Sequence, residues 1–368
     1  MNQRLQTAVF SAKQAKQLGR TAYHPDTGIL WCSLSATGIE FGFRGKECIL
    51  TLTADSAYAA GEAKAARYAV YCNDTLVTAA LLTEPERTVT VQNPDEEEKT
   101  AQVRLVKLSE AMMSSFGVRE IRILSSDTAV QKYQYSIFVS GEKMPHLIEF
   151  IGDSITCGYG IDGQFPDEPF KTANENAVKS FAYLTAQRLH ADYSMVCYSG
   201  HGIISGYTET GERMTHELVP PYYGLAGYST AAIEGNRRIQ DDLWDFAEQP
   251  DLIVLNLGTN DASYTGEDPE KQAAFMRAYV EFLKNVRKKN PSAPLLCTLG
   301  IMDQKLCDAV AQAAAHYSSE TGDCRVRSMR FEMQSASDGY AVDWHPSVIT
   351  HEKAADCLCR EIQEWLGW

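Results

Sequence analysis

The apolar residues follow two different rhythms along the chain. Residues 1–143 contain short segments rich in β-branched and aromatic residues, often alternating with polar ones and separated by turn residues such as Asn73 and Asp74. The clearest of these segments are 28–45, 47–54, 66–77, 87–92, 101–110 and 119–125. Many short strands at this spacing predict an all-β domain of the sandwich or jelly-roll type.

Residues 144–368 alternate apolar runs with helical patterns. The predicted strands are 147–151, 193–198, 252–256, 294–299 and, more weakly, 325–329. Between them, 268–291 starts with Asp268 as an N-cap and Pro269 at the first helical position, and 304–322 ends at a glycine. Strands alternating with helices predict an α/β domain whose parallel sheet has helices on both faces. We place the boundary between the two domains after residue 143.

Charge and composition narrow the functional classes. The chain has 368 residues and a formal net charge of −14, which argues against nucleic acid and anionic membranes as partners. It lacks 18 consecutive apolar residues and a signal-peptide pattern at its start, so we expect a cytoplasmic protein with no membrane span. Ten cysteines without a C-x-x-C pair predict reduced, mostly buried thiols rather than a metal cluster.

The first chemical signal is the stretch LIEFIGDSITCGYG, residues 147–160. An apolar strand stops at Gly152 and is followed by Asp153, Ser154 and further glycines. Glycines allow a sharp turn, so Ser154 is placed to project from the carboxyl end of the strand with its backbone N–H facing the same space. The alternative interpretation is an ordinary helix-capping serine.

Two further strand ends carry similar signals. CYSGHGII, residues 197–204, offers Gly200 or Gly202 for a close backbone N–H, and a plain turn is the alternative. LNLGTND, residues 255–261, ends in Asn260, whose side-chain amide is a suitable donor to an oxyanion. Because ligands gather at the carboxyl ends of parallel strands, we expect these segments to lie together.

The fourth signal is DGYAVDWHPSVITHEK, residues 338–353. A serine nucleophile must pass its proton to a base, and an imidazole does this near neutral pH. His345 is the candidate base, and Asp343 is placed to orient it. His345 and His351 lack a third plausible ligand nearby, so we expect no zinc site.

These four segments resemble the sequence blocks of the SGNH (GDSL) hydrolases over residues 147–368. The resemblance implies a flavodoxin-like, three-layer catalytic domain, residues 144–368, that hydrolyses esters without a cofactor. It also implies Ser154 as the nucleophile, with Ser154 N–H, Gly202 N–H and the Asn260 side chain as the oxyanion donors. We prefer Gly202 to Gly200 because of its offset from the strand.

Residues 19–45, 107–123 and 219–229 also resemble carbohydrate esterase family 2. That family implies an N-terminal jelly roll, residues 1–143, and removal of acetyl groups from sugars of plant polysaccharides such as xylan or mannan. The D-x-H spacing of Asp343 and His345 is shared with members that use a Ser–His dyad. Either the Asp343 carboxylate or a backbone carbonyl is therefore expected to orient the imidazole.

Other residues receive supporting roles in this interpretation. Trp344, Tyr222, Tyr223 and His201 are candidate substrate contacts, with packing or surface positions as the alternatives. Asp153 and Asp261 are expected to support the serine turn and the asparagine, unless they serve only as helix caps. The predicted partner is an acetylated xylo- or manno-oligosaccharide. The alternatives are a lipase or thioesterase that takes a longer acyl group, and a sugar-binding protein whose catalytic half has decayed.

Overall fold

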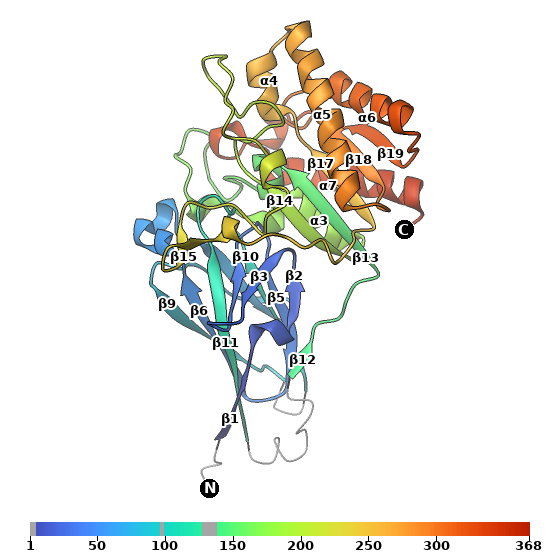
Figure 1. Cartoon of the computed structure of the whole chain (residues 1–368). Coiled ribbons are helices and arrows are strands. Elements are labelled where there is room, and N and C mark those ends of the chain that lie inside the picture. Colours follow the sequence, from blue (N-terminus) through green and yellow to red (C-terminus); the bar gives the residue numbers. More distant parts are fainter. Residues whose placement is uncertain (1–4, 96–98, 127–137) are drawn as a thin grey trace. The chain divides into compact units, whose positions relative to one another are not determined.

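The computed structural model describes residues 5–95, 99–126 and 138–368, which divide into two compact units (Figure 1). The first comprises Met1–Lys143, Lys171–Ala173 and Ala226–Asp242, and the second Met144–Phe170, Asn174–Leu225 and Leu243–Trp368. The two later segments of the first unit were not foreseen from the sequence. Within the described residues, no helix is both long enough and apolar enough to span a bilayer.

The first unit is built from antiparallel strands. They are β1 (Leu5–Phe10), β2 (Lys16–Leu18), β3 (Thr21–His24), β4 (Ile29–Cys32), β5 (Gly38–Phe43), β6 (Glu47–Ala54), β7 (Arg67–Cys72), β8 (Thr75–Leu81), β9 (Glu86–Gln92), β10 (Ala101–Lys107), β11 (Phe116–Ser126), β12 (Phe138–Ser140), β15 (Ala232–Glu234) and β16 (Arg237–Arg238). One sheet has the order β3-β4-β11-β6-β9 with β1 on β11, and the other the order β12-β5-β10-β7-β8 with β2 on β5.

The apolar residues of both sheets form one core, which explains the alternation in the sequence. Phe41 and Leu105 come from one sheet and Leu50 and Ile121 from the other, and all four are fully buried in the same cluster. Each strand therefore turns every second side chain inward. This confirms the predicted jelly-roll type of domain.

The second unit contains five parallel strands and the helices that connect them. The strands are β13 (His146–Gly152), β14 (Ala191–Cys197), β17 (Leu252–Asn256), β18 (Leu295–Leu299) and β19 (Val326–Arg330). The helices are α2 (Ser154–Cys157), α3 (Phe181–Arg188), α4 (Thr259–Thr265), α5 (Pro269–Lys289), α6 (Cys307–Thr321) and α7 (Val348–Leu366). Strands β17 and β18 are apolar and buried almost throughout and β13 and β14 mostly so, as expected for strands covered on both faces, whereas the edge strand β19 is mostly exposed.

Short 3₁₀ helices complete the described chain. They are η1 (Ala12–Gln14), η2 (Ser56–Ala63), η3 (Thr172–Asn174), η4 (Ala177–Lys179), η5 (Pro220–Tyr222), η6 (Ile239–Asp241), η7 (Ala336–Asp338) and η8 (Val342–Trp344). The last of them, η8, leads directly into the segment that carries His345.

The sheet order is β14-β13-β17-β18-β19, which is 2-1-3-4-5 in chain order and confirms the flavodoxin-like prediction. From β13 the chain crosses one way to β14, and from β17 it proceeds the other way through β18 to β19. Right-handed crossovers therefore place α3 on one face of the sheet and α5 and α6 on the other. Helix α7 packs beside α3, and α5 beside α6. The carboxyl ends of all five strands share one edge, where the predicted site residues occur.

Candidate active site

Ser154 stands two positions after the end of β13, at the first position of the short helix α2. The carboxylate of Asp153 caps that helix by accepting a hydrogen bond of 3.0 Å from the Ile155 N–H. Because Asp153 takes the capping role, the Ser154 hydroxyl remains available for other contacts. The sequence left open whether Ser154 itself was the cap, and the structure gives that role to Asp153.

The structure brings His345 to Ser154 across 191 positions of the chain. The His345 Nε2 lies 2.8 Å from the Ser154 Oγ. On the other side of the ring, Nδ1 lies 3.1 Å from the Val342 carbonyl oxygen and 3.2 Å from that of Asp343. The carboxylate of Asp343 instead accepts a hydrogen bond of 2.7 Å from the Tyr159 hydroxyl. Backbone carbonyls therefore hold the imidazole, the second of the two orientations predicted from the sequence.

The surroundings of His345 keep its ring neutral. Burial lowers the pKa of His345 to about 4, although the carbonyls of Val342 and Asp343 and the charge of Asp343 act in the opposite direction. An imidazole with this pKa is unprotonated at neutral pH and accepts a proton at Nε2. With Nδ1–H donating to the carbonyls, the free lone pair points at the serine hydroxyl.

Asn260 presents an amide donor from the first turn of α4, just after β17. Its Nδ2 donates one hydrogen bond of 2.9 Å to the His201 carbonyl oxygen, which fixes the orientation of the amide. A primary amide carries two hydrogens on that nitrogen. Asn260 also lines the same cavity as Ser154 and His345, so its second hydrogen is available to an oxyanion there.

The structure corrects the choice between the two glycines after β14. The Gly202 N–H donates to the Glu217 carbonyl oxygen at 3.2 Å, and Gly202 is not among the residues that line the cavity. Gly200 does line the cavity, in a left-handed conformation with φ of +77°. The offset from the strand was misleading because the chain turns once more at Gly200. Gly200 rather than Gly202 is the candidate backbone donor.

Two buried aspartates support these turns. Asp261 accepts hydrogen bonds from the backbone N–H groups of Ile203, Ile204 and Ser205, at 2.7–3.1 Å. Burial raises the pKa of Asp261 to about 6, although these three donors lower it. Burial likewise raises the pKa of Asp153 to about 7; the Ile155 N–H opposes this, and the charge of Asp261 adds to it. Both carboxyls serve the scaffold of the site.

The predicted sugar contacts fall into two groups. Trp344 lines the cavity and is 61% exposed, so its indole face is open to a ligand. His201 is buried, with its Nδ1 bound to the Ser199 carbonyl oxygen. Tyr223 is also buried, donating to the Glu149 carboxylate, and the Tyr222 hydroxyl donates to the His216 carbonyl oxygen. The structure thus places His201, Tyr222 and Tyr223 in the packing behind the site and outside the cavity lining.

The cavity itself has a volume of about 830 Å³ and lies entirely in the second unit. Outside the four predicted segments, its lining includes Tyr207, Glu209, Glu217, Met302, Asp303 and Lys305, and inside the first segment it includes Tyr159, to which the sequence analysis gave no role. Sequence reasoning missed these residues because they occur in loops without a strand-end pattern. Tyr159 carried one usable signal, since it stands between two glycines five positions after the serine.

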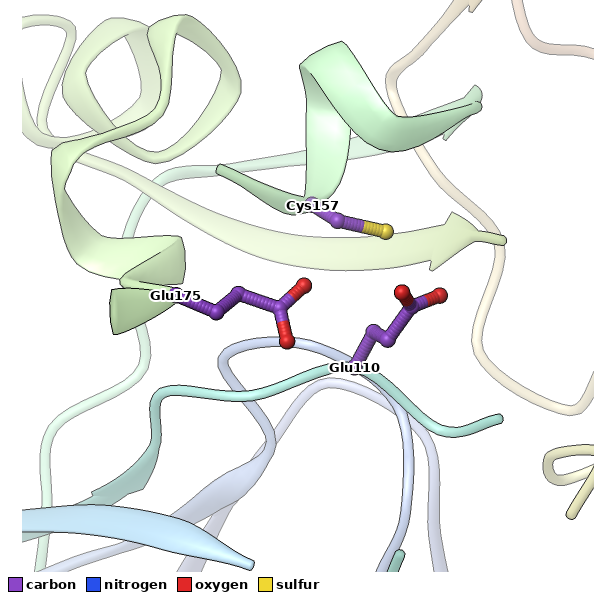
Figure 2. A group of neighbouring side chains, drawn as sticks. All are labelled: Glu110, Cys157 and Glu175. Carbon is purple, nitrogen blue, oxygen red and sulfur yellow. The ribbon is translucent and has the colours of Figure 1, made fainter. Parts of the chain in front are cut away.

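Cys157 lies close to the nucleophile in sequence but is fully buried on α2. Its sulfur and a carboxylate oxygen of Glu175 lie within 4.8 Å of each other, and Figure 2 shows both side chains pointing into the same space. The third side chain in Figure 2, Glu110, belongs to the first unit.

Comparisons with known proteins agree with this geometry. The model of the GDSL-like lipase/acylhydrolase family matches residues 150–353. Cellulase/esterase CelE of Acetivibrio thermocellus is 33% identical over 257 residues, which are 68% of this chain and 29% of CelE. An acetylxylan esterase / glucomannan deacetylase of Cellvibrio japonicus is 29% identical over 224 residues, 59% of this chain and 56% of that protein. The chain thus spans less than two thirds of either relative.

Solved structures match over nearly the whole chain. A family two carbohydrate esterase from Clostridium thermocellum, solved in complex with cellohexaose, gives a TM-score of 0.77 at 26% identity, covering 98% of this chain and 100% of that one. The acetyl xylan esterase Est2A from Butyrivibrio proteoclasticus gives a TM-score of 0.83 at 23% identity, covering 99% of each chain, and shares the fold.

Proposed function

Because the chain belongs to the GDSL-like lipase/acylhydrolase family, as its motifs predicted, we propose that it is a carbohydrate O-acetyl esterase. Its substrates on this proposal are acetylated xylo- or manno-oligosaccharides. The observation that carries the proposal is the hydrogen bond of 2.8 Å between Ser154 Oγ and His345 Nε2 at the wall of an open cavity. The curated relatives named as acetylxylan esterases support the substrate class.

The reaction proceeds in two steps on this proposal. His345 Nε2 takes the Ser154 proton while Oγ attacks the ester carbonyl carbon, and the negative charge develops on the carbonyl oxygen. The N–H groups of Ser154 and Gly200 and the Asn260 amide donate to that oxygen. The imidazolium then returns the proton to the departing sugar oxygen. Water, deprotonated by the same imidazole, attacks the acetyl-serine and releases acetate.

The cavity lining favours a sugar ester over a long acyl chain. A long acyl group gains its affinity from burial against an extended apolar surface. Here Glu209, Glu217 and Asp303 stand in the wall, and the aliphatic side chains of the lining are Ala262 and Met302. Carboxylates suit the hydroxyl groups of a neutral sugar, and the exposed face of Trp344 suits the apolar face of a pyranose ring.

The direct test follows acetate release by NMR from acetylated xylo-oligosaccharides and manno-oligosaccharides. We expect release by the wild type and none by the Ser154→Ala variant. The same pair is then compared on acetyl and octanoyl 4-nitrophenyl esters, where we expect a preference for acetyl. A preference for octanoyl would favour the lipase or thioesterase alternative, and binding without acetate release would favour the decayed sugar-binding protein.

A further inference from the structure

The carboxylate of Asp343 is bound by a tyrosine to which the sequence analysis gave no role. The Tyr159 hydroxyl donates to Asp343 Oδ2 at 2.7 Å. The Tyr159 ring stacks on Phe170, with centroids 3.9 Å apart and planes 10° from parallel, and its other neighbour is the His345 ring at 4.3 Å. Tyr159 therefore lies beside the base His345, while its hydroxyl donates to Asp343, two positions before His345 in the chain.

The segment that carries Asp343 has an unfavourable backbone conformation. Asp343 and Trp344 are consecutive non-glycine residues with φ of +51° and +60°. The left-handed region costs an L-residue about 1–2 kcal/mol, and such conformations persist only where the surroundings impose them. Trp344 is largely exposed, so the packing of its own side chain does not impose it.

This backbone conformation aims the two carbonyls at the imidazole. The oxygens of Val342 and Asp343 both lie within 3.2 Å of His345 Nδ1. When Nε2 takes the serine proton, the positive ring depends on these acceptors, because no carboxylate is bonded to Nδ1 in the described structure. A segment free to turn would weaken both contacts in the transition state more than in the ground state.

The loop that carries Tyr159 also ties the base to the nucleophile. It follows directly after α2, whose first residue is Ser154. The same loop accepts the Asp343 N–H at the Pro166 carbonyl oxygen, at 2.8 Å. At Gly160, which has φ of +61°, an added Cβ would collide with Val342, so the two segments approach closely there. One loop thus holds both reacting groups.

We propose that the hydrogen bond from Tyr159 to Asp343 is a latch that positions the Val342 and Asp343 carbonyls against His345, so that Tyr159 and Asp343 are positioning residues of the reaction. The role of Asp343 on this proposal is to accept from Tyr159, and its negative charge is dispensable. The latch rests on the proposed serine–histidine chemistry, whichever ester is the natural substrate.

The first test is Tyr159→Phe, which keeps the ring between Phe170 and His345 and removes only the hydroxyl. Losing a hydrogen bond of about 1.4 kcal/mol corresponds to a fall of about tenfold. We expect that fall in kcat on 4-nitrophenyl acetate, with KM within about twofold of the wild type, because the latch acts on the charged ring and not on substrate binding. An unchanged kcat would overturn the latch.

The Asp343→Asn variant distinguishes the latch from a conventional triad, in which the carboxylate itself orients the histidine. Asparagine tolerates the left-handed region, and its amide oxygen still accepts from the Tyr159 hydroxyl. We expect this variant to keep kcat within about threefold of the wild type, whereas an orienting carboxylate predicts a loss of about 10⁴. The double variant Tyr159→Phe, Asp343→Asn should be no slower than Tyr159→Phe alone. A loss above a hundredfold in Asp343→Asn, or additive effects, would overturn the proposal.

Tyr317→Phe is the matched control. Its hydroxyl also faces a carboxylate of the same unit, Asp323 at 3.4 Å, but Tyr317 does not line the catalytic cavity. We expect it to leave kcat unchanged. As a readout independent of turnover, the ¹H–¹⁵N resonance of His345 Nδ1–H should move upfield and exchange faster in Tyr159→Phe and stay in place in Tyr317→Phe. An unmoved resonance in Tyr159→Phe would count against the latch.

These outcomes separate the latch from the proposed substrate class. A wild type that hydrolyses 4-nitrophenyl acetate but leaves acetylated oligosaccharides intact would overturn the substrate proposal alone. Latch variants with wild-type kcat, in an enzyme that deacetylates oligosaccharides, would overturn the latch alone.

Discussion

At the scale of single residues, the site depends on groups whose hydrogen-bonding capacity is divided between the scaffold and the reaction. Asn260 gives one amide hydrogen to the His201 carbonyl oxygen and keeps the other for the cavity. His345 gives Nδ1–H to two carbonyls and keeps its Nε2 lone pair for Ser154. Each group is oriented by its contacts with the scaffold, which leaves one amide hydrogen of Asn260 and the Nε2 lone pair of His345 available to the reaction.

Asn260→Ala tests the oxyanion role of the amide. Removing one such donor costs about 3–4 kcal/mol in comparable sites, so we expect kcat on 4-nitrophenyl acetate to fall about a hundredfold or more. KM should change little because the negative charge exists only in the transition state. A loss below tenfold would mean that the two backbone N–H groups suffice. Asn285→Ala, at an exposed position of α5 outside the cavity lining, serves as the control.

The low pKa of His345 sets the acid limb of activity. The ring must be neutral to accept the serine proton, and burial lowers its pKa from 6.5 to about 4. Activity is therefore present above the folded-state pKa and lost as the pH falls through it. We expect kcat/KM to be flat from pH 8 to about 6 and to fall with an apparent pKa well below 6.5. A midpoint at 6.5 or above would show that the ring is solvated in the free enzyme.

At the scale of elements, the sequence predicted the second unit best where burial restricts a position to apolar residues. The strands β13, β14, β17 and β18 were recognised because parallel strands covered on both faces must be largely apolar, whereas the edge strand β19, with Arg327 and Ser328 exposed, gave only a weak signal. The long helices α5 and α6 were recognised from their end signals, Asp268 and Pro269 at the start of α5 and the glycine at the end of α6. The helix α3 was missed because it is short and most of its residues are buried, so it shows no polar face to reveal its period.

The same contrast applies to the site. Ser154, Asn260 and His345 stand at strand ends or before a helix, where local patterns reveal them. The choice of Gly200 over Gly202 depends on a hydrogen bond to Glu217, and the turn of Asp343 toward Tyr159 depends on a loop over 170 positions away. Neither contact leaves a local pattern by which it could be predicted from a single sequence.

The buried carboxylate of Asp261 holds the turn after β14, so a single substitution can test the importance of that turn. Oδ1 of Asp261 accepts from three consecutive residues, 203–205, and Oδ2 also accepts from Ile203; in an asparagine one of these oxygens is replaced by an NH₂ group, which cannot accept. We expect Asp261→Asn to lower the free energy of unfolding by about 1–3 kcal/mol and to lower kcat, because Gly200 belongs to the same turn. Thermal unfolding and kcat are the measurements.

Asp268→Asn is the matched control for that change. Asp268 caps α5 at an exposed position, where asparagine caps as well as aspartate does. It should leave both stability and kcat nearly unchanged. Equal effects of the two substitutions would contradict the specific role of Asp261.

At the scale of the whole molecule, sequence order and compact units do not coincide. Residues 226–242 lie between β14 and β17 of the second unit but belong to the first. There Glu234 and Asp242 flank the buried ring of His24 at 2.8 and 2.9 Å, and Ile233 and Ile239 pack on Trp31. A boundary drawn once along the sequence misses such a return because the contacts join residues some 200 positions apart.

The buried carboxyl of Asp153 gives the folded chain a pH dependence that can be measured. Burial raises its pKa from 3.8 to about 7, and its Oδ2 has no hydrogen-bond partner among the described residues. A folded-state pKa above the unfolded value means that the folded state binds the proton more tightly. The stability from this group is therefore complete below about pH 4 and is lost as the pH rises through 7.

Asp153→Asn removes that titration and keeps an acceptor for the Ile155 N–H, since asparagine is also a good N-cap. The free energy of unfolding of the variant minus that of the wild type, measured by thermal unfolding, should therefore be more positive at pH 8.5 than at pH 5, by on the order of a few kcal/mol at most. Other titrating groups, including His345 and His351, whose lowered pKa values act in the opposite direction, are common to both proteins and largely cancel in the difference. A difference that stays constant between the two pH values would mean that Asp153 is ionised throughout, with a partner that offsets its burial.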